Sequence, residues 1–312
     1  MNIQEAKRIL DQGKLVAVPT ETVYGLAANA FNSEACELIF KLKKRPQTNP
    51  LIVHLSSIEE VYSVAKNIPP EAVILGKVFW PGPLTIVLEK QEIVPSIVTA
   101  GQNTVAVRVP NHPLLLELLK ELDYPIAAPS ANKYQSISPT QPSHVLKSLG
   151  NVPILDGGVC SKGIESTIVG FKEGKVVVFR HGSITAEDIE SQTSLKVVDQ
   201  QNEEVKLPGQ ALKHYSPTTK FIYTNNPSKA FKDWQGKRIV FLKFTNNIIE
   251  PPDFIQTINM IKERGISGAS EKLYAVLHDL DQKDYDVIIA EQVNPVGIGK
   301  AINDKLIRAQ NI

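Results

Sequence analysis

The sequence predicts an α/β protein of two domains, and three observations carry this prediction. Apolar runs of strand length alternate with segments of helical periodicity through residue 180, the pattern of a sheet that carries helices. A polar stretch without a convincing period follows, as in an interdomain linker, and strand-like and helical segments then return. We therefore expect a first domain over residues 1–182, a linker over 183–215 and a smaller second domain over 216–312.

The start of the first domain predicts two helices and two strands in alternation. Apolar residues between Ile3 and Leu10 recur at helical spacing, and Gly13 is placed to cap the helix at its C-terminus. The run KLVAVP then predicts a strand. Ser33 is placed to cap a second helix, which must end before Pro46, and LIVHL predicts a second strand.

Later segments continue the same alternation. Ser57 and Glu60 have the spacing of a capping box ahead of another helix, and Pro113 suits the first turn of the Leu-rich helix that follows VAVRVP. The stretch ISPTQPSHVLKSLG predicts a turn leading into a short helix. In the second domain KFIYT, RIVFLKF and YDVIIAE predict strands, while segments 271–280 and 299–308 predict helices.

Composition excludes several classes of protein. The 34 Lys and Arg against 33 Asp and Glu give a net charge of +1, so no general attraction to nucleic acid or anionic membrane is expected. The two cysteines, Cys36 and Cys160, form no CxxC or Cys/His cluster, which argues against a zinc site or a disulfide scaffold and predicts buried thiols. The N-terminus lacks a signal peptide's apolar core, and no run approaches the ~18 apolar residues of a membrane span. We expect a cytoplasmic protein.

Common catalytic motifs are absent from the sequence. It contains no GxxxxGK[ST] loop, no GxGxxG after a strand, no GxSxG, no HExxH and no defensible pair of carboxylates. A nucleotide, if bound, must therefore be held by residues outside these standard motifs.

Five polar stretches lie where strand ends or turns are expected, and each alone has a structural alternative. KLKKRPQTNPLIVHL also suits a solvated helix end, and the serines of IAAPSANKYQSISPT also suit a capped turn. PTETVYGL and GIESTIVGF adjoin strands, the latter ahead of a strand that ends in Arg180. In TVAVRVPNHP, Arg108 stands in an apolar strand and needs a partner, for which a carboxylate is the natural choice.

Taken together, these stretches resemble the YrdC-like family in its two-domain form, the threonylcarbamoyl-AMP synthases. The signature of that family, Lys-x-Arg and then Ser-x-Asn, is matched by Lys43, Arg45, Ser130 and Asn132. PTETVYGL, FWPGPLT, VRVPNHP and IESTIV resemble family blocks in the same order, and LPGQALKHYSP resembles the linker segment that returns to the active site. The resemblance implies a twisted mixed-sheet YrdC-like domain joined by a long linker to a smaller Rossmann-like domain.

The resemblance also implies an activity. The family consists of nucleotidyltransferases that join L-threonine, bicarbonate or carbon dioxide, and ATP into L-threonylcarbamoyl-AMP with release of pyrophosphate. The product serves the modification of an adenosine in tRNAs reading ANN codons, so the tRNA threonylcarbamoyl-transfer machinery is an expected partner. Positioning and charge stabilisation suffice for such a reaction. Magnesium is expected to bridge the phosphates with no dedicated protein ligands.

Carried over position by position, the resemblance divides the polar residues between two substrates. Lys43 and Arg45 are expected to face the triphosphate as the catalytic pair. The expected nucleotide contacts are Lys43, Arg45, Asn49, Thr104, Ser130, Asn132, Ser138, Arg180 and Tyr215. The expected L-threonine contacts are Thr22, His54, Arg108 and Ser166, with Arg108 as a fork on the carboxylate and His54 in a binding role rather than as a base.

Two other functions are compatible with the same sequence. A YrdC-like domain also suits an RNA-binding module, although the near-neutral charge and the lack of an aromatic strip leave at most a weak RNA contact. A regulator that binds threonine and ATP without turnover is the second alternative. Nothing in the second domain indicates a phosphate loop or a catalytic cluster.

Overall fold

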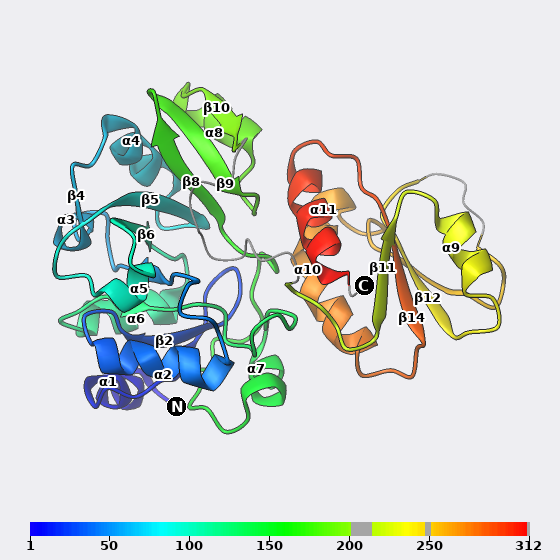
Figure 1. Cartoon of the computed structure of the whole chain (residues 1–312), viewed down its shortest axis with the longest axis horizontal. Coiled ribbons are helices and arrows are strands. Elements are labelled where there is room, and N and C mark those ends of the chain that lie inside the picture. The colour runs from blue at the N-terminus through cyan, green and yellow to red at the C-terminus, as the bar shows by residue number, and fades with distance from the viewer. Residues whose placement is uncertain (201–213, 247–250, 311–312) are drawn as a thin grey trace. The chain divides into compact units, whose positions relative to one another are not determined.

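The computed structural model describes residues 1–200, 214–246 and 251–310, which divide into two compact units. Within these ranges the first unit holds residues 1–134 and 138–200, and the second holds residues 135–137 and everything from residue 214 onward. Each unit has its own sheet (Figure 1). The expected linker segment 201–213, including most of LPGQALKHYSP, lies outside the described residues.

The first unit is built on a mixed sheet, as the sequence predicts. Among the described residues it has ten strands in the order β1-β2-β7-β3-β6-β5-β8-β9-β10, with β4 paired to the end of β5. The pairs β3 with β6, β5 with β8 and β9 with β10 are parallel, and the others are antiparallel. The strands are β1 (Val16–Val18), β2 (Gly25–Asn29), β3 (Ile52–His54), β4 (Ala65–Lys66), β5 (Leu84–Lys90), β6 (Thr104–Arg108), β7 (Ile126–Ala127), β8 (Thr167–Lys172), β9 (Lys175–Arg180) and β10 (Val197–Asp199).

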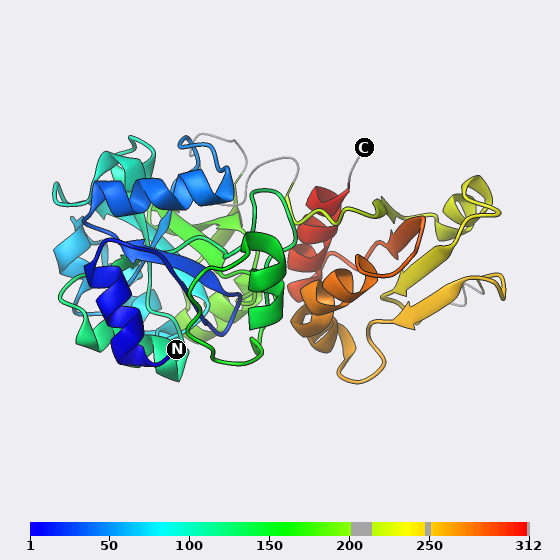
Figure 2. The same cartoon turned by 90° about the horizontal axis from the view of Figure 1, so that it is seen from below.

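Helices cover both faces of this sheet. They are α1 (Ile3–Asp11), α2 (Ser33–Lys43), α3 (Val61–Val64), α4 (Pro70–Phe79), α5 (Ser96–Thr99), α6 (Pro113–Glu121), α7 (Pro142–Leu149) and α8 (Ala186–Thr193). Along β1, Val16 and Val18 pack with α1 and α6, whereas Ala17 packs into the larger core with α2 and α4. This follows from the two-residue period of a strand. Figure 2 shows α1 and α2 on opposite sides of β2.

Most predicted elements are confirmed, and two N-terminal capping predictions, those for Ser33 and for Ser57 with Glu60, are corrected. Pro113 occupies the first turn of α6, and α7 follows the predicted turn. The cap of α2 is Asn32 rather than Ser33, because the Asn32 side chain accepts a hydrogen bond from Ala35 N. Ser57 makes no capping box with Glu60, which is itself the residue before a single-turn helix, α3.

The polar stretch that we expected to be linker is partly folded. Residues 186–193 form α8, which begins with a capping box between Thr185 and Asp188, and β10 pairs in parallel with β9. The only fully buried side chain of α8 is Ile189, so a helix of this kind carries almost no apolar period in its sequence. The first unit therefore extends to the end of the described segment at residue 200.

The second unit is a parallel sheet with helices on both faces. Its described strands run in the order β11-β14-β12-β13 and are β11 (Lys220–Thr224), β12 (Ile239–Lys243), β13 (Gln256–Asn259) and β14 (Val287–Glu291). Its helices are α9 (Pro227–Asp233), α10 (Gly265–Leu280) and α11 (Ile298–Ala309). Figure 1 shows α9 on one side of the sheet and α10 and α11 on the other. This layering confirms the Rossmann-like prediction, although β13 was not predicted.

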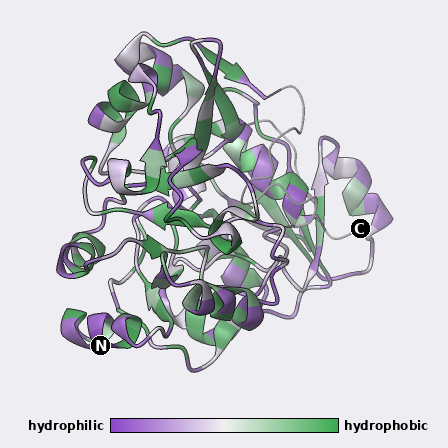
Figure 3. Cartoon of the chain, turned by 60° about the vertical axis from the view of Figure 1, so that its left-hand side comes forward, coloured by the Kyte–Doolittle hydropathy of each residue, from purple (hydrophilic) through white to green (hydrophobic). Residues whose placement is uncertain are grey.

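Hydropathy follows the layers of each unit. In Figure 3 the strands are largely hydrophobic, while most helices carry both colours, as amphipathic helices do. In the part of the chain that the structure describes, no helix has both the length and the apolar character needed to cross a membrane.

Candidate active site

Polar side chains of the central strands share one face of the first unit's sheet. Side chains two residues apart on a strand point the same way, so His54 lies on the face of Ile52, and Arg108 lies on the face of Ala106 and Thr104. The strands β3 and β6 place His54 and Arg108 in register as neighbours. This face carries a small apolar cluster, separate from the two larger cores, made of Ile52, Val87, Ala106 and Ile168 with Phe179 against it. His54 and Arg108 therefore lie at the edge of this apolar cluster.

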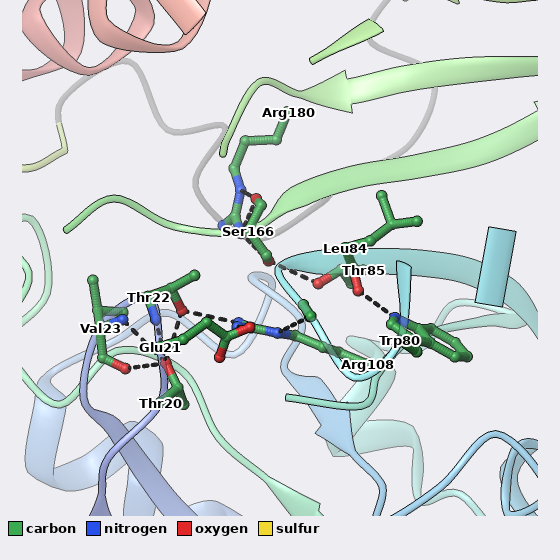
Figure 4. A network of polar contacts seen from close by, with 11 residues as sticks. Thr20, Glu21, Thr22, Val23, Trp80, Leu84, Thr85, Arg108, Ser166 and Arg180 are labelled. Carbon is green, nitrogen blue, oxygen red and sulfur yellow. Dashed lines mark hydrogen bonds and ion pairs between the residues drawn. The ribbon is translucent and has the colours of Figure 1, made fainter. Parts of the chain in front are cut away.

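Arg108 is held on three sides by the protein (Figure 4). It is 3% exposed at the end of β6, and its Nε donates to the Gly82 carbonyl oxygen at 3.2 Å. Its Nη1 donates to Thr22 Oγ1 at 3.0 Å, and its Nη2 lies 2.7 Å from Glu21 Oε1 as an ion pair. The predicted carboxylate partner of this arginine thus exists within the chain.

The PTET turn orients Thr22 toward Arg108. Thr20 Oγ1 donates to the Val23 carbonyl oxygen at 2.7 Å and accepts the main-chain N–H groups of Thr22 and Val23 at 3.0 and 3.1 Å. The Thr20 and Thr22 hydroxyl oxygens are 2.8 Å apart. Either of these two hydroxyls could donate to the other, and Thr22 Oγ1 also accepts from Arg108 Nη1.

A second polar group joins residues that we assigned to different substrates. Arg180 donates to the Ser166 carbonyl oxygen from Nε at 3.0 Å and from Nη2 at 2.8 Å, and from Nη2 to Ser166 Oγ at 3.0 Å. Ser166 Oγ is also 2.8 Å from Thr85 Oγ1. Beside them, Ser138 Oγ donates to Glu165 Oε1 at 2.6 Å. Arg180, from the nucleotide set, and Ser166, from the amino acid set, are therefore in direct contact.

The two signature motifs meet at the end of α2. Lys43 is 1% exposed, and its Nζ donates to the carbonyl oxygen of Ser130 at 2.6 Å and to that of Asn132. Burial, and then the charge of Arg45, hold the pKa of Lys43 well below its usual value.

Arg45 organises the loop that follows α2. Its Nε donates to the Asn49 carbonyl oxygen at 3.1 Å, and its Nη2 donates to the Pro50 carbonyl oxygen at 2.9 Å. The side-chain Oδ1 of Asn49 is buried, and no hydrogen-bond partner for it occurs in the described residues. Such an atom is a candidate ligand contact, because buried polar atoms are normally paired.

His54 is a neutral imidazole. It is 3% exposed, and its Nδ1 lies 3.2 Å from the Ile52 carbonyl oxygen. Burial, and then the charge of Arg108, lower the pKa of His54 to about 3. A ring in this state offers one donor and one acceptor, which suits hydrogen bonding to a ligand.

Tyr215 belongs to the second unit. It is fully buried there, its ring stacks on Tyr274 with centroids 5.5 Å apart, and Lys305 Nζ lies 5.4 Å from its centroid. Its contact with a nucleotide stays a prediction.

Sequence reasoning left several polar groups of the site without a role. Glu21, Gly82, Thr85 and Glu165 lie inside quoted blocks, but their partners are far away along the chain. The sequence feature that points to a residue such as Glu21 is Arg108, because an arginine in an apolar strand needs a carboxylate partner. No group of three or more His, Cys, Asp or Glu side chains placed to hold a metal occurs in the described ranges.

The arrangement is suited to binding anions. Lys43, Arg45, Arg108 and Arg180 are each less than a tenth exposed, and all four donate to main-chain carbonyl oxygens. Groups fixed in this way need little reorganisation when charge develops on a ligand, which is the condition for electrostatic stabilisation of a transition state.

Comparison with known proteins agrees with this geometry. The model of the Sua5/YciO/YrdC family, described as "Telomere recombination", matches residues 8–182. The chain belongs to this family. A second model, described as "Threonylcarbamoyl-AMP synthase, C-terminal domain", matches residues 184–310.

Relatives of this Sua5/YciO/YrdC chain extend over almost its whole length. The threonylcarbamoyl-AMP synthase of Pyrococcus abyssi is 37% identical over 325 residues, which cover 98% of this chain and 93% of the relative. That of Bacillus subtilis is 37% identical over 321 residues, covering 98% and 92%. The crystal structure of P. abyssi Sua5 complexed with L-threonine is similar to this structure with a TM-score of 0.85 at 36% identity, and 98% of this chain and 93% of that chain are covered. The predicted family and fold class are thereby confirmed.

Proposed function

We propose that this protein synthesises L-threonylcarbamoyl-AMP from L-threonine, bicarbonate or carbon dioxide, and ATP, with release of pyrophosphate. The observation that carries the proposal is the match over 98% of the chain to enzymes named threonylcarbamoyl-AMP synthase. The four buried basic side chains of the first unit support it, because the reaction assembles two anionic substrates and develops further charge on phosphate.

The amino acid side of the proposed site consists of Thr22, His54, Arg108 and Ser166. Arg108 Nη2 is ion-paired with Glu21 Oε1 but makes no hydrogen bond in the described part of the chain, and the proposal assigns this nitrogen to the substrate carboxylate. Neutral His54 stands beside it in the sheet register. Thr22 and Ser166 contribute hydroxyls that are already oriented by Thr20 and Thr85.

The nucleotide side consists of the residues around the end of α2 and Arg180. In the proposal Lys43 and Arg45 face the triphosphate and act as the catalytic pair, while Asn49 offers its unpaired Oδ1. The further contacts that we propose are Thr104, Ser130, Asn132, Ser138, Arg180 and Tyr215. Magnesium would enter with the nucleotide and neutralise phosphate charge, held by phosphate oxygens and waters.

The product would serve the modification of tRNAs reading ANN codons through a separate transfer machinery, and we place the reaction in the cytoplasm. Carbamoylation needs the free amine of threonine. The resulting carbamate must then meet the α-phosphorus in line with the departing pyrophosphate, which is a matter of positioning.

One assay tests the function. The purified chain is incubated with ATP, magnesium and L-threonine, with and without bicarbonate, and pyrophosphate and the adenylate are measured by enzymatic assay and mass spectrometry. We expect a product that depends on bicarbonate and on threonine. A folded preparation that binds both substrates without forming it would instead be the non-catalytic regulator.

A further inference from the structure

A buried donor and a buried acceptor lie side by side without hydrogen bonds. Arg108 Nη2 and Glu21 Oε1 are 2.7 Å apart, yet neither atom makes a hydrogen bond, and Glu21 Oε2 has none either among the described residues. Glu21 is 5% exposed. The ion pair engages Nη2 and Oε1, whereas Oε2 is left unpaired, and a buried polar atom in that state costs about 1 to 3 kcal/mol. An unpaired buried atom in a native structure calls for an explanation, and a role in catalysis is one.

The main chain around Glu21 fixes its position. The Thr20 hydroxyl oxygen, just before Glu21, accepts hydrogen bonds from the main-chain N–H groups of Thr22 and Val23, just after it. The Glu21 carbonyl oxygen accepts a hydrogen bond from Lys162 N at 2.8 Å. Figure 4 shows the Glu21 carboxylate alongside the Arg108 guanidinium. Both groups are thus held in place before any ligand arrives.

Charge decides what kind of ligand this pair fits. Arg108 alone would select a simple anion, but the neighbouring carboxylate repels one and cancels the net charge of the pair. A ligand with a negative and a positive group on the same carbon fits both members at once. An α-amino acid is such a ligand, because its carboxylate can accept from Nη2 while its ammonium donates to Glu21.

We propose that Glu21 binds the ammonium group of the substrate amino acid and accepts its proton, so that Glu21 and Arg108 together form a receptor for the zwitterion. This inference rests on the proposed function and adds a catalytic residue to it. One ammonium N–H bond breaks, its electron pair stays on nitrogen, and an O–H bond forms on Glu21. The neutral amine then attacks bicarbonate to give the carbamate and one water, and the proton on Glu21 returns to solvent with product release.

The titratable groups that interact with Glu21 are compatible with this role. Arg108 faces it from β6, His112 follows β6, and Cys160 lies in the loop before β8. Burial is the main cause of both shifts: it lowers the pKa of His112 and raises the pKa of Cys160 to about 12. Both side chains are therefore neutral near pH 7. Within this group we therefore assign the acceptor role to Glu21.

Ligand analogues test the binding part. Calorimetry of the full chain compares L-threonine with 2,3-dihydroxybutanoate, which has a hydroxyl in place of the ammonium group, each with and without a non-hydrolysable ATP analogue. We expect the wild type to prefer threonine at least tenfold, and Glu21→Gln to lose that preference. Glu21→Asp, which keeps the charge, is expected to retain it within about threefold. A wild type without the preference, a Gln variant that keeps it, or equal loss in both variants would overturn the inference.

The proton-transfer part has a kinetic readout. General base catalysis contributes about 10²- to 10⁴-fold, so turnover of Glu21→Gln should fall about a hundredfold at pH 7. The deficit should shrink as the pH rises toward the pKa of the free amine, because solvent then supplies neutral threonine. Glu291→Gln in the second unit, another buried carboxylate, is the control and should keep normal turnover. A deficit that does not change with pH would contradict proton acceptance.

The two proposals fail separately. The calorimetric comparison needs no turnover, so a wild type that discriminates by the ammonium group but makes no adenylate overturns the proposed function alone. A wild type that makes the adenylate, with a Glu21→Gln variant equally active at every pH, overturns this inference alone.

Discussion

The Nζ atom of Lys43 lies 2.6 Å from the main-chain carbonyl oxygen of Ser130, which joins the end of α2 to the turn after β7 across 87 residues of sequence. The same amine donates to the Asn132 carbonyl oxygen. Lys43 is therefore both a charge at the candidate nucleotide site and the donor that fixes the Ser-x-Asn turn.

This double role gives the first prediction, for Lys43→Met. The variant removes two hydrogen bonds from the Lys43 amine to main-chain carbonyl oxygens, so the first unit should lose about 1 to 3 kcal/mol of unfolding free energy, at about 0.5 to 1.5 kcal/mol for each bond. Turnover should also be lost. Thermal unfolding followed by circular dichroism, together with the adenylate assay, measures both effects.

Lys44→Met is the matched control for this variant. Lys44 is the exposed neighbour that ends α2 in a left-handed conformation, and the same substitution there should leave melting and turnover unchanged. An unaltered melting temperature in Lys43→Met would show that the two carbonyl contacts contribute nothing to stability.

Arg108→Lys tests the fork geometry. Lysine keeps the charge but cannot reach the Gly82 carbonyl oxygen, Thr22 and Glu21 together, because the guanidinium contacts them through three separate nitrogens. We expect the KM for L-threonine to rise at least tenfold, with little change in the KM for ATP. Initial rates at varied concentrations of each substrate give both constants.

The surface variant Arg8→Lys on α1 controls for an arginine-to-lysine change away from the site. Equal rises in both KM values of Arg108→Lys would point to a general loss of site structure rather than to a carboxylate contact.

The sequence predicts strands better than it predicts contacts. The apolar runs KFIYT and YDVIIAE coincide with β11 and β14. All five residues of β14 are buried, and a parallel strand buried on both faces leaves a continuous apolar signal. In contrast, α8 buries little more than Ile189, so the sequence of residues 186–193 lacks a helical apolar pattern and predicts a linker. The signature motifs predict residues of the candidate site but not their burial.

The pairing of Glu21 with Arg108 illustrates what sequence reasoning lacks. The strand pattern around Arg108 requires a carboxylate, but 33 acidic residues are candidates in the sequence. The choice depends on the sheet order, in which β6 and β2 are separated by β3 and β7 and loops bring the PTET turn back over the strand end. Such an order comes from long-range packing, which no local period encodes.

His54 predicts how stability depends on pH. The native state keeps this imidazole neutral with a pKa of about 3, whereas in the unfolded chain its pKa is near 6.5. Below pH 6.5 the unfolded state therefore binds more protons, and unfolding free energy is lost as the pH falls toward 3, by at most about 1.4 kcal/mol per pH unit. His54→Asn should remove this contribution.

Chemical denaturation of both proteins at pH 7.5, 6.5 and 5.5 measures the effect. The advantage of the wild type over His54→Asn should be constant above pH 7 and should shrink at pH 5.5. The pair at pH 7.5 is the internal control, since His54 is neutral in both states there. An advantage that stays the same at pH 5.5 would mean that the native state admits a proton to this ring.

Gly82 links backbone packing to the proposed threonine site. A Cβ atom at this position would lie 2.2 Å from the Phe79 carbonyl oxygen, so Gly82→Ala must move the turn whose carbonyl oxygen accepts from Arg108 Nε. The same residue donates from its N–H to the Val109 carbonyl oxygen at 2.8 Å, which ties the turn to the end of β6. We expect a lower melting temperature and a KM for threonine about tenfold higher, measured by thermal unfolding and initial rates. Gly236→Ala in the second unit controls for strain alone, because an added methyl there meets nothing within 4 Å while its φ of +81° is unfavourable for alanine. This control should lose about 1 kcal/mol of stability and keep its threonine KM, whereas an unchanged KM in Gly82→Ala would disconnect the turn from substrate binding.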